Sequence, residues 1–289
     1  MLLIAGTIVV IASILGGYLM EHGVMALLYQ PAELVIIGGA AGGTLLISTP
    51  PAVVKDLLAQ LKRLLTPAPG REDYKNLLAM LYQLFRVVQQ SGVMALESHF
   101  EKPTDSPVLK RYPKFLANHS ALGFLSDSAK VIISGGISPH DFEHLMSEDL
   151  EVRHKHAMSA SATLQKVGDA LPGLGIVAAV LGIVITMQAI DGPVEVIGEK
   201  VGAALVGTFL GILLSYGFVG PMATAMEHRV GDEANIEQCI MAGLLAIYKG
   251  CAPAIAVEFS RRVIPEESRP SFEETEQICR GTREMKEAA

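Results

Sequence analysis

The sequence predicts an all-α integral membrane protein with four transmembrane helices and a helical cytoplasmic domain. Half of its 289 residues are hydrophobic and 18% are charged, whereas soluble domains carry about a quarter charged residues. The missing charge is concentrated in four stretches, and Lys and Arg collect between the second and the third. The formal charge of −7 argues against nucleic acid as a partner, and the three cysteines show no paired metal or redox spacing.

Four stretches contain no charged side chain: Leu2–Met20, Leu34–Val54, Ala170–Ile190 and Val201–Met226. A helix rises about 1.5 Å per residue, so each stretch is long enough to cross roughly 30 Å of hydrocarbon and contact lipid. The first stretch has no basic n-region and no Ala-x-Ala cleavage site, so we expect a retained anchor and not a signal peptide.

Positive charge sets the expected orientation and divides the chain. Residues 55–168 hold 14 of the 23 Lys and Arg, and the segment Glu21–Pro31 holds none. Because positive loops stay inside, both termini and the long loop should be cytoplasmic. The predicted parts are transmembrane helices 1 and 2 (1–54), a cytoplasmic helical loop (55–168), transmembrane helices 3 and 4 (169–226) and a cytoplasmic helical tail (227–289).

The cytoplasmic segments show helical periodicity and no alternating strand pattern. Apolar residues at 3–4 spacing predict a helix over Tyr74–Met94. Ser138-Pro139 is typical of a helix start. Asp232–Tyr248 and Pro253–Val263 read as two further helices, and the Glu-rich tail after Pro265 is expected to be mobile.

Two enzyme motifs occur as string matches. Gly173-x-Gly175-x-x-Ala178 copies the dinucleotide fingerprint, but that motif must follow a strand, and here it lies in an uncharged stretch where small residues let helices approach. His140, Glu143 and His144 copy a zinc-protease pattern. Acidic residues in a first helical turn also complement the helix dipole without a metal. We predict no enzyme, no metal and no cofactor, and keep a membrane metalloprotease as a weak alternative.

The four stretches contain small residues suited to helix packing but no Asp, Glu, Lys, Arg or His. The Gly38–Gly43 run and Gly207-x-x-x-Gly211 favour close helix association. An ion path usually contains a charged residue, so either another chain supplies it or the stretches only anchor the protein. Pro172 and Pro221 are expected at the same end of neighbouring helices, where two prolines suggest a hinge. The Thr208 hydroxyl either bonds its own backbone or lines a hydrated path.

Several motifs together resemble the MotA family of flagellar motor stator subunits over nearly the whole chain. They are Ala204–Leu213 followed by Pro221, Gly16–Met20, Tyr29–Ile37, Ile132–Gly135, Val167–Pro172, Ala252–Phe259 and Arg269–Phe272. The related ExbB and TolQ proteins share channel-like helices but differ in topology, and the four-stretch layout fits MotA better.

The resemblance implies a partner and an assembly. MotA-like subunits form a homo-oligomeric, pentameric ring in the bacterial inner membrane around a MotB-like, peptidoglycan-anchored partner, which supplies the membrane aspartate. Ion passage is expected to turn the ring, and the cytoplasmic loop to push the rotor protein FliG. In this resemblance Pro172 and Pro221 match functional prolines, and Thr208 matches a pore-side threonine.

The resemblance also bears on ion choice. Sodium-driven relatives tend to carry a threonine where this chain has Ala179, and a methyl group offers sodium no oxygen ligand. We therefore expect protons, with a sodium-driven stator or an ExbB/TolQ-type energy-transducing subunit as alternatives.

The rotor-facing charges match the family only in part. Glu97 stands where the family has its functional acid, whereas Gln89 stands where the family has an arginine. Arg86 lies one turn earlier, within reach of the same helix surface.

Overall fold

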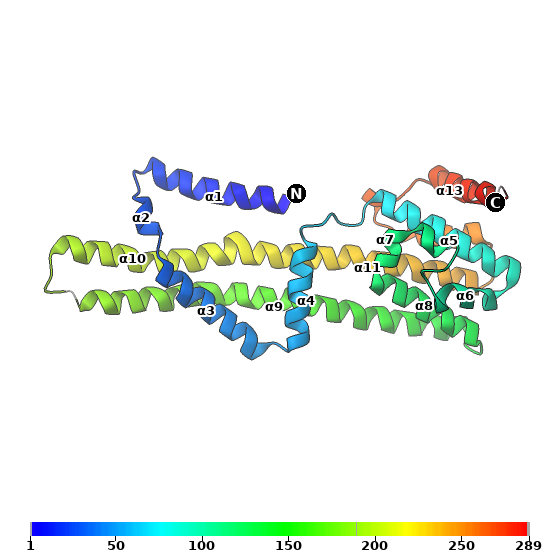
Figure 1. Cartoon of the computed structure of the whole chain (residues 1–289), viewed down its shortest axis with the longest axis horizontal. Helices are drawn as coiled ribbons and strands as arrows, with labels where there is room; N and C mark the ends of the chain where they lie inside the picture. The colour runs from blue at the N-terminus through cyan, green and yellow to red at the C-terminus, as the bar shows by residue number, and fades with distance from the viewer. Residues whose placement is uncertain (1, 189, 288–289) are drawn as a thin grey trace. The chain divides into compact units, whose positions relative to one another are not determined.

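The computed structural model describes residues 2–188 and 190–287, with side chains described to residue 281, and its regular structure in these ranges is helical with no strand. The chain divides into two compact units: Met1–Pro67 with His156–Arg229, and Ala68–Lys155 with Val230–Ala289. Residues 55–67 and 156–168, expected in the cytoplasmic loop, fall in the first unit. Each unit is described by itself below, with helix labels as in Figure 1.

The first unit holds all four helical segments that are apolar and long enough to cross a membrane. Its elements are α1 (Leu2–Met20), α2 (Met25–Leu28), α3 (Pro31–Ser48), α4 (Pro51–Arg63), the later part of α9 (Pro139–Met187), α10 (Val194–Ile212), the π-helical turn η3 (Leu213–Val219) and the first residues of α11 (Gly220–Tyr248). The first predicted span is confirmed residue for residue by α1.

The second span differs from its predicted bounds of 34–54. It begins at Pro31, which occupies the first turn of α3, and ends at Ser48. Proline at the first helical position is favoured because its missing N–H has no partner there. At the other end, Pro50 and Pro51 follow Thr49, and a residue before proline avoids helical backbone angles. The correction places Glu33 inside the first turn of α3.

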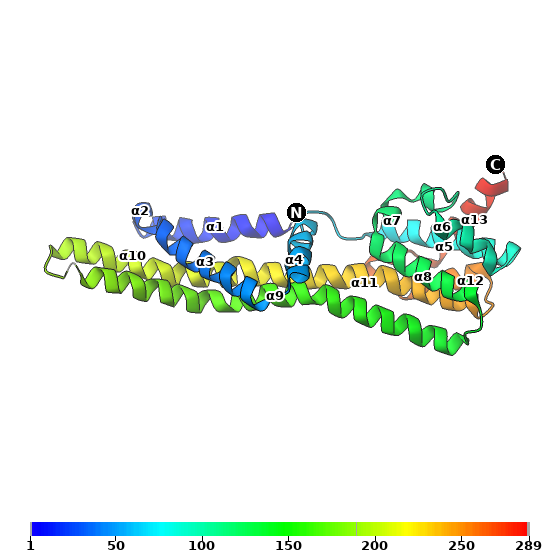
Figure 2. The same ribbon diagram turned by 60° about the horizontal axis from the view of Figure 1, so that its bottom comes forward.

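Helices α9 and α10 of this unit run side by side in both ribbon views (Figures 1 and 2). A Cβ atom added to Gly211 would lie 2.6 Å from the Leu171 carbonyl oxygen and 2.8 Å from the Gly175 Cα. This backbone contact confirms the expected small-residue interface. Helix α3 packs on α10 and buries Ile37 in a cluster with residues of α9.

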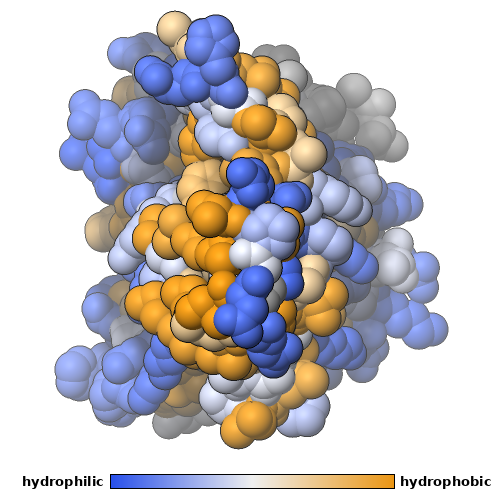
Figure 3. All heavy atoms as spheres, turned by 90° about the vertical axis from the view of Figure 1, so that its left-hand side faces the viewer, coloured by the Kyte–Doolittle hydropathy of each residue, from blue (hydrophilic) through white to orange (hydrophobic). Residues whose placement is uncertain are grey.

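Large apolar side chains cover the outside of the helices in this unit. Ile176, Val180 and Ile185 of α9 are each more than half exposed, and orange apolar atoms fill much of the centre of the face in Figure 3. None of the residues of α1, all of them described, is buried. Such continuous apolar exposure is typical of a surface meant for lipid or for partner helices.

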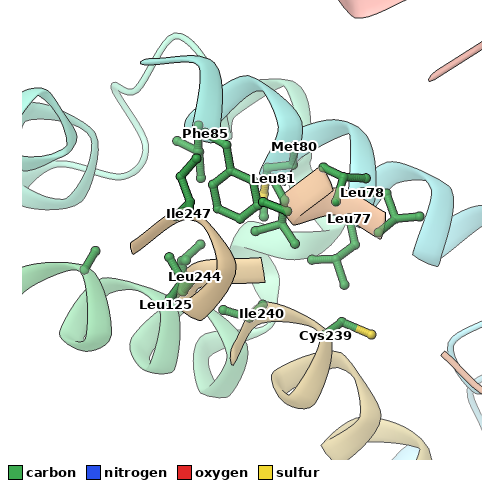
Figure 4. Packing of buried hydrophobic residues seen from close by; sticks show 14 of the residues in the cluster. Leu77, Leu78, Met80, Leu81, Phe85, Leu125, Cys239, Ile240, Leu244 and Ile247 are labelled. Carbon is green, nitrogen blue, oxygen red and sulfur yellow. The ribbon is translucent and has the colours of Figure 1, made fainter. Parts of the chain in front are cut away.

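The second unit is a helical bundle with its own apolar core. Its elements are α5 (Arg71–Ser91), η1 (Val93–Leu96), α6 (Glu97–Glu101), η2 (Leu109–Arg111), α7 (Pro113–Ala117), α8 (His119–Ser134), the first part of α9, most of α11, α12 (Pro253–Arg262), η4 (Glu266–Ser268) and α13 (Phe272–Glu287). Figure 4 shows α5 side chains such as Leu81 and Phe85 facing Leu125 of α8 and Leu244 of α11.

Glycines in left-handed backbone end two of these helices. Gly92, with φ of 78°, ends α5, so the predicted continuation to Met94 is wrong. Gly250, with φ of 85°, separates α11 from α12. Glycine adopts this conformation without the penalty that a Cβ imposes.

The tail after Pro265 forms η4 and then α13, and α13 is held by local and long-range contacts. The Ser271 Oγ accepts a hydrogen bond from the Glu274 N–H at 3.2 Å, and the Glu274 carboxylate accepts one from the Ser271 N–H at 2.7 Å. This reciprocal capping box starts α13. Arg71 and Lys75 of α5 pair with Glu274. The Ser271 N–H and these cations lower the pKa of Glu274 to about 2.

Candidate functional site

Of the two predicted ion-path residues, Ala179 lies at the contact where α9 packs on α10, and Thr208 follows the glycine on the other side of that contact. Ala179 of α9 is 7% exposed. Its backbone nitrogen lies 3.1 Å from the position that a Cβ on Gly207 would occupy, and Gly207 directly precedes Thr208 in α10. Glycine and alanine at this contact allow the two helices to approach closely.

The Thr208 hydroxyl has no hydrogen bond to any residue that the structure describes, although it is only half exposed. Other threonines of this unit behave differently: Thr7, Thr44 and Thr186 donate to carbonyl oxygens three or four residues earlier. Back-bonding was the alternative interpretation for Thr208, and it is wrong. The hydroxyl keeps both its donor and its acceptor for other groups.

Pro172 and Pro221 lie toward the same end of the helix pair but are not opposite each other. A Cβ on Gly168 would lie 3.2 Å from the Val219 Cγ1 and 3.6 Å from the Gly220 nitrogen. Gly168 is one turn before Pro172, and Gly220 directly precedes Pro221. The Leu171 carbonyl oxygen, next to Pro172, instead lies against Gly211 of α10, so the two prolines are offset along the pair.

The backbone conformation at Pro172 differs from that before Pro221. Pro172 lies inside α9, which continues through it. Pro221 follows the π-helical turn Leu213–Val219, and the Gly220 N–H donates to the Ser215 carbonyl, five residues earlier. Such turns are rare and concentrate at functional positions.

A buried carboxyl group in this unit was missed from the sequence. Glu33 is 8% exposed, and its Oε2 lies 2.6 Å from the Cβ position of Gly207. The second span was defined in the sequence by its lack of charged residues, so the predicted span began at Leu34, one residue after Glu33. The signal that could have found it is Pro31, which marks a helix start two residues earlier.

The predicted rotor-facing residues lie in the second unit. Glu97 begins α6 and is exposed, Gln89 is exposed near the end of α5, and Arg86 is half-buried in α5. Neither Arg86 nor Glu97 forms an ion pair with another described residue. The structure thus leaves the Glu97 carboxylate open to another molecule, and does not join it to Arg86.

The residues of the zinc-protease pattern lie at the start of α9, where they make hydrogen bonds and ion pairs with neighbouring side chains. The Asp141 N–H donates to the Ser138 Oγ at 3.1 Å, Glu143 pairs with Lys249 at 3.3 Å, and His144 lies 3.9 Å from Glu148. Among the described residues, no group of three or more His, Cys, Asp or Glu side chains is placed to hold a metal.

The dinucleotide match lacks its structural context. Gly175 lies within α9 and packs against Gly211 of α10. The motif needs a strand before it and a helix starting at it, and α9 begins far upstream, at Pro139.

Comparison with known proteins assigns most of the chain to described families. Residues 4–92 match the family described as Motility protein A N-terminal, and residues 117–238 match the MotA/TolQ/ExbB proton channel family. Motility protein A of Salmonella typhimurium is 39% identical over 284 residues, which cover 98% of this chain and 96% of that protein. The Escherichia coli protein of the same name gives the same values.

Solved structures show the same fold. A chain of the C. jejuni MotAB structure superposes with a TM-score of 0.76 at 19% identity, covering 93% of this chain and 98% of that one. A chain of the flagellar MotAB stator complex from Bacillus subtilis gives 0.70 at 22% identity, covering 92% and 96%.

Proposed function

This chain belongs to the motility protein A (MotA) family, and on that premise we propose that it is the ring subunit of a proton-driven flagellar stator. The observation that carries the proposal is the near full-length relationship to Motility protein A at 39% identity. The four helices apolar enough to cross a membrane fit that role.

The partner is a MotB-like chain anchored to peptidoglycan. The contact between α9 and α10 offers the free Thr208 hydroxyl and the Ala179 methyl group, and neither of them carries a proton through the membrane. A carboxylate from the partner, facing this helix pair, supplies the missing group, because ion paths need an ionisable residue within the membrane. Several copies of this chain surround the partner in the inner membrane, with both termini on the cytoplasmic side.

Proton specificity follows from the chemistry around Ala179. Sodium needs oxygen ligands to replace its water, as hard cations do, and the methyl of Ala179 provides none. The side-chain oxygen beside Gly207, on the other side of the contact, belongs to Glu33.

Torque transfer belongs to the second unit. Glu97 is exposed and without an ion pair among the described residues, so its carboxylate is available to a basic surface on the rotor protein FliG. Gln89 contributes a neutral amide where the family has an arginine. A positive charge at this position would be repelled by a basic rotor surface, and the amide avoids that repulsion. Pro172 and Pro221 provide bending points near η3.

The test is ion flux into vesicles that contain this chain and its cognate partner with the partner's plug segment removed. We expect uptake driven by a pH gradient, and loss of uptake when the partner's membrane aspartate is changed to Asn. That neutral variant is the matched control for leakage. Uptake driven only by a sodium gradient overturns the ion assignment, and absence of both overturns the stator function.

An ExbB/TolQ-type role has one supporting observation, the match of residues 117–238 to a family that includes those proteins. Motility separates the two roles: the stator restores swimming to a cell that lacks its own ring subunit, whereas an energiser of another system does not.

A further inference from the structure

Glu33 is an acidic side chain buried inside the membrane unit, and the ion path described above does not use it. It lies in the first turn of α3 and is 8% exposed. Its Oε2 is buried and has no hydrogen-bond partner among the described residues. An unpartnered carboxyl group inside a membrane protein carries a high free-energy cost, so its presence usually indicates a function.

The neighbours of this carboxyl group are small and form a slot for it. Its Oε2 lies 2.6 Å from the Cβ position of Gly207, and its Oε1 lies 3.5 Å from the Cβ position of Gly182. Ala204 stands beside Gly182, at 2.7 Å from the same Cβ position. A side chain at Gly207 would occupy the space of the carboxyl group, so this glycine accommodates Glu33 as well as the Ala179 backbone.

The slot also adjoins the ion-path residues. The Cβ position of Gly207 that Oε2 approaches lies 3.1 Å from the Ala179 nitrogen, and Gly207 directly precedes Thr208. The atoms nearest to the slot come from glycine and alanine, so none of these neighbours titrates or carries charge. An ionised carboxylate in such surroundings costs far more than a protonated one.

We propose that Glu33 is a proton-binding site of the ring subunit itself, loaded and unloaded as ions pass along this helix pair. The inference rests on the proposed function, which needs a proton path at this helix pair. Oε2 takes up one proton to form a carboxylic acid while it lies in the slot, and releases the same proton to water that enters the slot. No other bond forms or breaks.

The experiment compares proton uptake by vesicles containing the complete complex with Glu33→Gln or with Glu195→Gln. Glutamine has the size of glutamate but cannot exchange a proton, so we expect uptake to fall at least tenfold while the complex still assembles. Glu195 lies in the first turn of α10 and is exposed, so its neutralisation should leave uptake within twofold of wild type. Wild-type uptake in Glu33→Gln overturns the inference and leaves the stator function intact, whereas absence of uptake in the wild-type complex overturns the function itself.

Infrared difference spectroscopy keeps the inference testable if Glu33→Gln does not assemble. In a complex whose partner aspartate is changed to Asn, Glu33 is the buried carboxyl group among the described residues of the first unit. We expect an infrared band of a protonated carboxyl group, and we expect this band to disappear when the external pH is raised. A spectrum without such a band overturns the inference.

Discussion

The closest backbone contact of the membrane unit predicts a large effect for one methyl group. In Gly211→Ala the added Cβ lies 2.6 Å from the Leu171 carbonyl oxygen and 2.8 Å from the Gly175 Cα, while carbon contacts are optimal at about 3.5–4.0 Å. Both neighbours are backbone atoms, so the two helices must separate. Overpacking typically lowers the free energy of unfolding by about 1–3 kcal/mol. Because the added methyl group of Gly211→Ala makes two such contacts, we expect a cost near the upper end of this range.

The net expectation includes the helix preference of alanine. Alanine gains about 0.5–1 kcal/mol over glycine in a helix interior, so Gly211→Ala should lower the free energy of unfolding by about 2 kcal/mol. Gly202→Ala is the matched control on α10, because its Cβ meets nothing within 4 Å, and it should be neutral or stabilising by about 0.5–1 kcal/mol.

The assay is unfolding of the purified protein in mixed micelles by titration with SDS, followed by helix signal. If Gly211→Ala is as stable as Gly202→Ala, α9 and α10 do not pack through their backbones as described. Loss of stability in both variants alike would point to a general sensitivity of α10 and would equally refute the reasoning.

Three further predictions concern the path, the hinge and the tail. Thr208→Val should reduce proton uptake by vesicles about tenfold because a methyl replaces the free hydroxyl, while Thr208→Ser keeps it; equal uptake in the two would exclude a role for the hydroxyl. Pro172→Ala should conduct protons but lose swimming, because the bending point is removed; full swimming in this variant contradicts the hinge. The pKa of Glu274 is lowered to about 2, so the stabilisation of α13 is present above the ordinary value of 4.5 and is lost as pH falls toward 2. Thiol labelling of Cys279 at neutral pH, read by mass spectrometry, should therefore accelerate in Glu274→Gln but not in Glu267→Gln, an exposed residue of η4; unchanged labelling in Glu274→Gln would refute docking through Glu274.

Hydropathy predicted the membrane helices well because lipid imposes one simple requirement along about 20 residues. It placed α1 correctly and found α9 and α10 by their uncharged stretches. It failed at α3, where the helix start is set by Pro31 and not by the last charge. Because the spans were predicted from their lack of charge, Glu33 was placed outside the membrane helix that contains it.

In the tail, the prediction from composition overlooked local chemistry. Its many glutamates suggested a mobile segment, yet Ser271 and Glu274 stand three apart as a capping box, a pattern that is readable from the sequence. What the sequence could not provide is the position of Arg71, which pairs with Glu274 from 203 positions away. Long-range ion pairs need the fold to be known first.

The two prolines were expected to act alike, and the backbone gives them different properties. Helix α9 continues through Pro172, so the cost of its missing N–H is absorbed by one regular helix. The chain before Pro221 already has π-helical bonding, with the Gly220 N–H bonded five residues back to Ser215. Bonding of this kind can shift by one residue at small cost, because the alternative α-helical partner lies close by. Bending is therefore easier before Pro221 than at Pro172.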